Sequence, residues 1–206
     1  RSRRKAAGQF VTPPEVAFLL AALTMDNKEK HTLDPCCGTG TIARAIYEIK
    51  CSYGIRPQDA LATTWASDKF AFPVQVAALA MSRPEHMGMM IRVFSEDVIN
   101  LKSQMPVSLV DPHTGEPVNE PLPEMGYIVS NLPFVQHEDL SASNPNVTGV
   151  NDQTRSVLGD NDVGLDGRSD LCAYIPFALW DLLEDGGQLG IIISNSWLST
   201  GWGSTF

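Results

Sequence analysis

The segment 33–41, with the sequence LDPCCGTGT, constrains the fold of this chain more than any other stretch. Pro35 cannot extend a strand ladder because it has no N–H, and Gly38 and Gly40 can adopt positive φ without a Cβ clash. Apolar residues at helical spacing follow directly. The segment is therefore typical of a strand that ends at Asp34, a tight turn and a new helix, although an ordinary strand-to-helix turn has the same short glycine pattern.

A turn of this kind places the unpaired N–H groups of the new helix beside whatever lies on the loop, which is a common arrangement for nucleotide ligands. Asp34 at the strand end could accept hydrogen bonds from cationic or hydroxyl groups of a ligand. Its negative charge disfavours a phosphate at that point. The sequence therefore indicates a nucleotide-type site.

Short apolar runs and helical patterns alternate along the rest of the chain. We expect strands at 31–34, 61–67, 91–94, 127–130 and 189–193. We expect a first helix after a capping box formed by Thr12 and Glu15, with a proline at its first position. Further helices are expected at 41–52, 70–82 and 171–183, the last of them with Pro176 in its interior.

Two stretches have no clear periodicity. Residues 103–126 are rich in proline and are expected to form a surface insertion. Residues 141–170 are rich in Asn, Asp, Gly and Ser and are expected to form a long loop able to close over a site. The order of the elements predicts an α/β fold with a doubly wound, mostly parallel sheet covered by helices.

Three successive predicted strands end in a carboxylate, at Asp34, Asp68 and Asp97. One acid at a strand end is commonplace, and Asp68 alone could equally cap the next helix. Three acids at the carboxyl ends of alternating strands converge on the crevice where such sheets bind ligands.

The totals limit the classes of protein to consider. A chain of 206 residues is expected to form one domain, and its net charge of −9 would repel a polyanion, so any contact with nucleic acid must be local. Without a long apolar run or a signal-peptide core, we expect no membrane span and a cytoplasmic location. The four cysteines have no CxxC spacing, so we read them as reduced thiols and expect no metal site.

The combination of GQFVTPP, LDPCCGTG, the acids after the second and third strands, and NLPF after the fourth spans nearly the whole chain. It resembles the N6-adenine DNA methyltransferases of restriction-modification systems, in the group whose TPP segment precedes the glycine loop. The resemblance implies a Rossmann-like catalytic domain dependent on S-adenosylmethionine, with 1–206 as a fragment that is incomplete at its C-terminal end. It implies methyl transfer to the N6 amino group of adenine in DNA.

The resemblance also implies how the cofactor is bound. Its methionine part would contact Phe10, Thr12 and Pro13, and its amino acid portion would be wrapped by Asp34, Cys36, Gly38 and Gly40. Asp68 would hold the ribose, Asp97 would accept from the amino group of the cofactor's adenine, and Val98 would pack on that ring. Lys69 departs from the family, which usually has an aliphatic ring-packing residue there, so that packing is lost or passes to Phe70.

In the mechanism of that family, the side-chain oxygen of Asn131 and the main-chain carbonyl of Leu132 accept the two hydrogens of the target amino group. Leucine replaces the usual proline at 132, but it keeps this carbonyl, and Pro133 favours extended backbone at the residue before it. Phe134 would stack on a base flipped out of the duplex. No covalent intermediate or metal is required, because sulfonium is a strong leaving group.

Two other interpretations remain open at this point. The acceptor could be a cytosine amino group, an RNA base or a protein glutamine, or the chain could be a cofactor-binding subunit without turnover. If the chain is an adenine DNA methyltransferase, its partner is double-stranded DNA, whose sequence is read by a recognition domain outside this chain. A restriction or specificity subunit is then a further expected partner.

Overall fold

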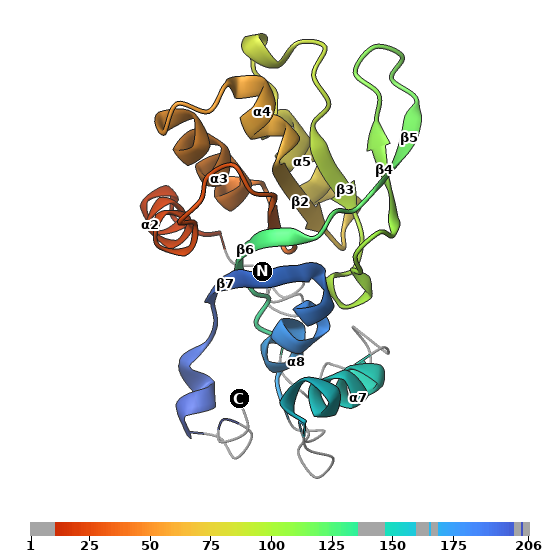
Figure 1. The fold of residues 1–206 in the computed structure, drawn as a ribbon. Coiled ribbons are helices and arrows are strands. Elements are labelled where there is room, and N and C mark those ends of the chain that lie inside the picture. Colours follow the sequence, from red (N-terminus) through yellow and green to blue (C-terminus); the bar gives the residue numbers. More distant parts are fainter. Residues whose placement is uncertain (1–10, 136–146, 160–164, 166–168, 200–202, 204–206) are drawn as a thin grey trace.

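The computed structural model of the protein describes residues 11–135, 147–159, 165, 169–199 and 203. Its main sheet contains five parallel strands in the order β3-β2-β1-β6-β7. Figure 1 shows β6 and β7 of this sheet side by side. These strands are β1 (Thr32–Asp34), β2 (Thr64–Asp68), β3 (Arg92–Ser95), β6 (Met125–Asn131) and β7 (Leu183–Ile192). The chain runs outward from β1 to β3 and then returns to β6 beside β1, which makes the β1–β6 boundary the topological switch point of the sheet.

Helices pack on both faces of this sheet because alternate strand residues point to opposite sides. In β6, Ile128 lies in the hydrophobic cluster that contains the α8 residues, whereas Tyr127 and Val129 pack with α2 and α3. In β2, Trp65 and Ala66 divide in the same way, Ala66 packing with α3, α4 and α5. The predicted doubly wound α/β fold is therefore confirmed.

The helices are α2 (Pro14–Thr24), α3 (Thr41–Ser52), α4 (Pro57–Ala62), α5 (Ala71–Met81), α7 (Val147–Leu158) and α8 (Leu171–Ala178). Short 3₁₀ turns occur at η1 (Pro84–His86), η2 (Val98–Asn100), η3 (Trp180–Leu182) and η4 (Asn195–Ser199). None of the helices in the described ranges has the length and apolar character needed to cross a bilayer.

The stretch 57–62 corrects one expectation, because it forms α4 and residues 61 and 62 therefore belong to a helix and not to the strand expected over 61–67. Pro57 begins the helix, where its missing N–H costs nothing, and Ala60 and Leu61 are buried by it. The β-branched residues that favoured a strand are used only from Thr64 onward, where β2 pairs with β1.

The proline-rich stretch 103–126 is a second correction, since it contains an antiparallel hairpin of β4 (Pro106–Val110) and β5 (Pro117–Pro121). Three of its prolines, Pro106, Pro117 and Pro121, stand at the ends of the two strands, where a missing donor is tolerated. Val107 and Leu109 alternate with exposed residues and are buried in the core.

The C-terminal third contains the remaining differences. The expected loop 141–170 includes α7, and the helix expected over 171–183 ends at Ala178 and continues as the turn η3. The last strand begins at Leu183, earlier than expected, because a register shift opposite Met125 and Tyr127 absorbs the Gly186 turn, whose φ is +77°.

Candidate active site

The carboxyl ends of four neighbouring strands meet at one edge of the sheet. Asp34 ends β1, Asp68 ends β2, Asp97 follows β3 and Asn131 ends β6. The pairing of Asp34 with Ala66 and of Asp68 with Ser95 keeps these ends level across the sheet. Parallel strands therefore bring the three predicted acids and the predicted amide to one edge, on both sides of the switch point.

The glycine loop after β1 needs glycine at both positions that the sequence indicated. Gly40 caps α3 with φ of +86°, and a Cβ there would lie 3.0 Å from the Cα of Ala77 on α5. Gly38 has φ of +51°, and a Cβ there would meet no atom of the described residues within 4 Å. Gly40 thus lets two helices approach each other, and Gly38 leaves a space above the loop that none of the described residues fills.

Asp34 is almost completely covered, with 1% of its surface exposed. Its Oδ1 accepts hydrogen bonds from Ser130 Oγ at 2.7 Å and from the backbone N–H of Cys36 at 3.3 Å. Burial, and to a smaller extent the charge of Asp68, raises the pKa of this carboxyl from 3.8 to about 7, while the two hydrogen bonds oppose the shift. Asp34 is therefore a buried acid whose ionised form a cationic group would stabilise.

Asp68 connects the end of β2 with the glycine loop. Its two oxygens accept from the backbone N–H groups of Gly38 at 3.0 Å and Phe70 at 2.9 Å. Burial raises the pKa of Asp68, and these two bonds lower it. The same carboxylate thus fixes the loop and the first residues after β2, so Asp68 is not simply a cap of the following helix.

Asp97 is held by both of its oxygens. Oδ1 accepts from the backbone N–H of Ile99 at 3.3 Å, and Oδ2 forms an ion pair with Lys69 Nζ at 2.9 Å. Lys69, where the sequence departs from the pattern of the similar family, therefore joins the residues after β2 to those after β3. Val98 beside Asp97 is buried in the main hydrophobic cluster.

Asn131 is joined to the start of the described chain. Its Nδ2 donates to Thr12 Oγ1 at 3.0 Å, so the Thr12 hydroxyl is bonded to Asn131 and makes no side-chain cap for α2. The expected capping box is wrong, and the helix begins at Pro14 after Pro13. Asn131 Oδ1 is buried and has no hydrogen-bond partner among the described residues. A buried acceptor without a donor is costly unless a ligand supplies one.

The rest of the NLPF motif lies directly beyond. The backbone N–H of Leu132 donates to the carbonyl of Ile192 at 3.0 Å, and its side chain is buried in the core. Pro133 and Phe134 are half-buried. Phe10 lies outside the described residues.

The cysteines of the loop are poorly suited to nucleophilic chemistry. Burial raises the pKa of both Cys36 and Cys37 well above its usual range, with the nearby acids adding to the shift. Their thiols are therefore protonated at neutral pH. Among the described residues, no group of three or more His, Cys, Asp and Glu side chains could hold a metal ion.

Sequence reasoning missed three contacts of this site: Ser130 on Asp34, Lys69 on Asp97 and Thr12 on Asn131. Only Lys69 gave a signal in the sequence, as the departure from the family pattern. The partners of the other two contacts are 96 and 119 positions apart in the chain, and no local pattern predicts such pairs.

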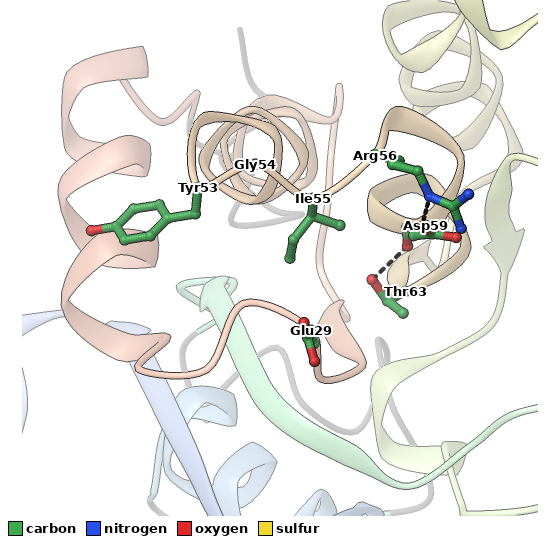
Figure 2. A pocket seen from close by; sticks show the side chains of 7 residues that line it. All are labelled: Glu29, Tyr53, Gly54, Ile55, Arg56, Asp59 and Thr63. Atoms are coloured by element: carbon green, nitrogen blue, oxygen red, sulfur yellow. Dashed lines mark hydrogen bonds and ion pairs between the residues drawn. The ribbon is translucent and has the colours of Figure 1, made fainter.

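A separate cavity of about 400 Å³ lies elsewhere in the molecule (Figure 2). Its lining includes Glu29, which precedes β1, and Thr63, which precedes β2, so it is at the amino-terminal edge of the sheet. Figure 2 shows Arg56 paired with Asp59, at 2.7 Å, and Thr63 bonded to the same residue. Arg56, Asp59 and Thr63 are therefore bonded to one another, and the cavity is at the opposite edge of the sheet from the strand-end acids.

The sequence model of one protein family, described as N-6 DNA Methylase, matches residues 1–205 of the chain. The match spans the TPP segment, the glycine loop, the three strand-end acids and Asn131.

Proposed function

Because the chain belongs to the N-6 DNA methylase family, and is thus a methyltransferase, we propose that it transfers a methyl group from S-adenosylmethionine to the N6 amino group of adenine in DNA. The observation that carries this proposal is the buried Oδ1 of Asn131 at the switch point of the sheet, an acceptor to which no residue of the described part of the chain donates. An amino group is the kind of donor that this atom lacks.

The carboxyl edge of β1, β2 and β3 fits the cofactor in its donor set. Asp34, with its pKa raised to about 7, would favour a ligand that carries an ammonium group. The space above Gly38, which no described residue fills, would admit a ligand against the backbone, and Asp68 beside it would hold ribose hydroxyls. When bound, S-adenosylmethionine would supply a methyl group activated by its positively charged sulfur.

The remaining proposed cofactor contacts come from the segment before α2, from the glycine loop and from the residues that follow β3. Thr12 and Pro13, with Phe10, would contact the methionine part, and Cys36 and Gly40 would complete the loop around it. Asp97 would accept from the adenine amino group. Val98 has only 5% of its surface exposed, so only a small part of its side chain would contact the adenine ring of the cofactor.

The acceptor side rests on two oxygens. Asn131 Oδ1 and the Leu132 carbonyl would each accept one hydrogen of the target amino group, which returns electron density to a nitrogen whose lone pair is delocalised into the purine. Phe134 would stack on the extruded base, because an amino group inside a duplex is out of reach. Pro133 restricts the backbone that carries the carbonyl.

Thr12 would orient the amide of Asn131. Because Nδ2 donates to the Thr12 hydroxyl, the amide is fixed with Oδ1 on the other side. An amide free to rotate would present its NH₂ group to the substrate half of the time and would repel an amino donor. The hydroxyl therefore selects the useful orientation.

We further propose that duplex DNA is the partner, with its sequence read by a recognition domain outside this chain and with a restriction or specificity subunit. The net charge of −9 supports this division, because a chain this acidic needs a basic surface from elsewhere to hold a duplex.

The test is methyl transfer by the full-length protein. Tritiated S-adenosylmethionine and unmethylated genomic DNA should give labelled N6-methyladenine after nuclease digestion and nucleoside analysis, and Asn131→Ala should abolish the label. Label in N4-methylcytosine, in RNA or in protein would reject the adenine proposal. Cofactor binding without transfer to any DNA would indicate a non-catalytic subunit.

A further inference from the structure

The ion pair between Lys69 and Asp97 places a fixed donor beside a fixed acceptor at the carboxyl edge of the sheet. Lys69 Nζ lies 2.9 Å from Asp97 Oδ2. The Lys69 side chain is 42% exposed and that of Asp97 is 16% exposed, so both heads are reachable by a ligand. A surface ion pair of this kind contributes little to stability by itself, so stability alone gives no reason for a lysine here.

Backbone hydrogen bonds fix the carboxylate of Asp97 and the main chain at Lys69. Asp97 accepts from the backbone N–H of Ile99, which fixes the carboxylate plane. Lys69 stands between Asp68 and Phe70, whose backbone N–H donates to the Asp68 carboxylate, so the chain at Lys69 is fixed to the residue proposed to hold the ribose. The donor and acceptor pair therefore lies next to the ribose position, where a nucleoside base would begin.

Adenine has a complementary edge, because its amino group is a donor and the ring nitrogens beside it are acceptors. We propose that Lys69 and Asp97 together read this edge of the cofactor, Asp97 accepting from the amino group and Lys69 donating to a ring nitrogen next to it. This inference rests on the proposed function and adds Lys69 as a specificity-determining residue. An aliphatic residue at 69 could pack on the ring but could not make this bond.

The test uses Lys69→Met, which keeps the apolar stem and removes the ammonium group. The matched control is Lys28→Met, which changes the net charge equally. Lys28 precedes β1, at the other edge of the sheet, where its ammonium faces the ring of Tyr53 at 4.6 Å. Lys28 is half-buried and its ammonium also donates to the carbonyl of Met25, so Lys28→Met loses a contact that does not involve the strand-end acids. Thermal unfolding should show that both variants are folded at the temperature of the binding measurement.

Calorimetry would measure the binding of S-adenosylhomocysteine and of its 1-deaza and 7-deaza analogues, each of which lacks one ring nitrogen. One of the two analogues lacks the ring nitrogen to which Lys69 is proposed to donate. We expect the wild type and Lys28→Met to bind that analogue about tenfold more weakly than the parent compound, because a hydrogen bond from a charged donor is lost. Lys69→Met should bind the parent about tenfold more weakly and should not distinguish that analogue from it.

An equal loss for the analogue in the wild type and in Lys69→Met would overturn the role of Lys69, as would no loss for either analogue in the wild type. In both cases tight binding of the parent compound would leave the proposed cofactor site intact. If the parent compound failed to bind to the wild type, the proposed function and this inference would both fall.

Discussion

The amide nitrogen of Asn131 lies 3.0 Å from the hydroxyl oxygen of Thr12, 119 positions earlier in the chain. The contact connects the segment before α2 with the carboxyl end of β6. The contact satisfies the NH₂ side of the amide, and among the described residues Oδ1 is buried without a donor. Thr12 therefore sets which side of the amide is left as an acceptor at the proposed catalytic position.

Removing the Thr12 hydroxyl should slow the chemical step. In Thr12→Val the shape is kept but Nδ2 loses its acceptor, so the amide can rotate, and we expect single-turnover methyl transfer at saturating cofactor to fall about 10- to 100-fold. Thr12→Ser keeps the hydroxyl and should stay within about threefold of the wild type. Equal rates for the two variants would show that Thr12 does not orient Asn131.

Asp34 should make cofactor binding dependent on pH. Its pKa is raised to about 7 by burial, and a ligand ammonium group favours the ionised form. Affinity for S-adenosylhomocysteine should therefore decrease as the pH falls from about 7.5 to 5.5, a range in which the ligand amino group remains protonated. Calorimetry in buffers of different ionisation enthalpy should detect proton release, and Asp34→Asn should bind weakly at every pH.

The same acid should affect the stability of the unliganded protein in the opposite direction. Since the pKa in the folded state exceeds the ordinary value of 3.8, the folded state binds more protons than the unfolded state between about pH 4 and 7. The free energy of unfolding contributed by Asp34 should therefore decrease as the pH rises through this window. The free energy of unfolding of Asp34→Asn, measured with urea at several pH values, should lack that component. If it depended on pH as steeply as that of the wild type, the raised pKa of Asp34 would be contradicted.

Gly40 and Gly54 allow strain and packing to be separated. Their φ angles are nearly equal, at +86° for Gly40 and +87° for Gly54. A Cβ at Gly40 would meet Ala77, whereas a Cβ at Gly54 would meet no described atom within 4 Å. We expect Gly54→Ala to cost about 1 kcal/mol, from backbone strain. Gly40→Ala should cost about 1–3 kcal/mol more, from overpacking against α5. Denaturant unfolding measures both, and equal costs would contradict the close approach of the two helices.

Leu132 and Asn131 should respond differently to truncation. The Leu132 side chain is 1% exposed, so Leu132→Ala should lose about 2–5 kcal/mol of stability, while its carbonyl keeps the rate of methyl transfer within a few fold below the unfolding temperature. Asn131→Ala should abolish transfer at a smaller cost in stability. Loss of transfer in folded Leu132→Ala would mean that the side chain takes part in positioning.

Local chemistry explains which parts of this fold the sequence predicts. The glycine loop depends on Pro35, Gly38 and Gly40, whose conformational limits are properties of single residues, and the parallel sheet follows from the alternation of strands and helices. The β4–β5 hairpin was not predicted, because its prolines match a loop until both strands are paired and each proline stands at a strand end.

The contacts within the site are harder to predict because they join distant segments. Asp34, Asp68 and Asp97 were found as strand-end acids, and the structure places them at one edge. That Thr12 bonds Asn131 rather than capping α2 depends on tertiary placement, which outweighs a local preference shared by many helix starts.

The pairing of β1 with β6 is fixed at Thr32 with Tyr127 and at Leu33 with Ile128. Main-chain ladder geometry therefore sets the spacing between the two strand ends that carry Asp34 and Asn131. Under the proposed function, an insertion in a loop after either strand would change which substrates reach this edge while these two strand ends keep their separation.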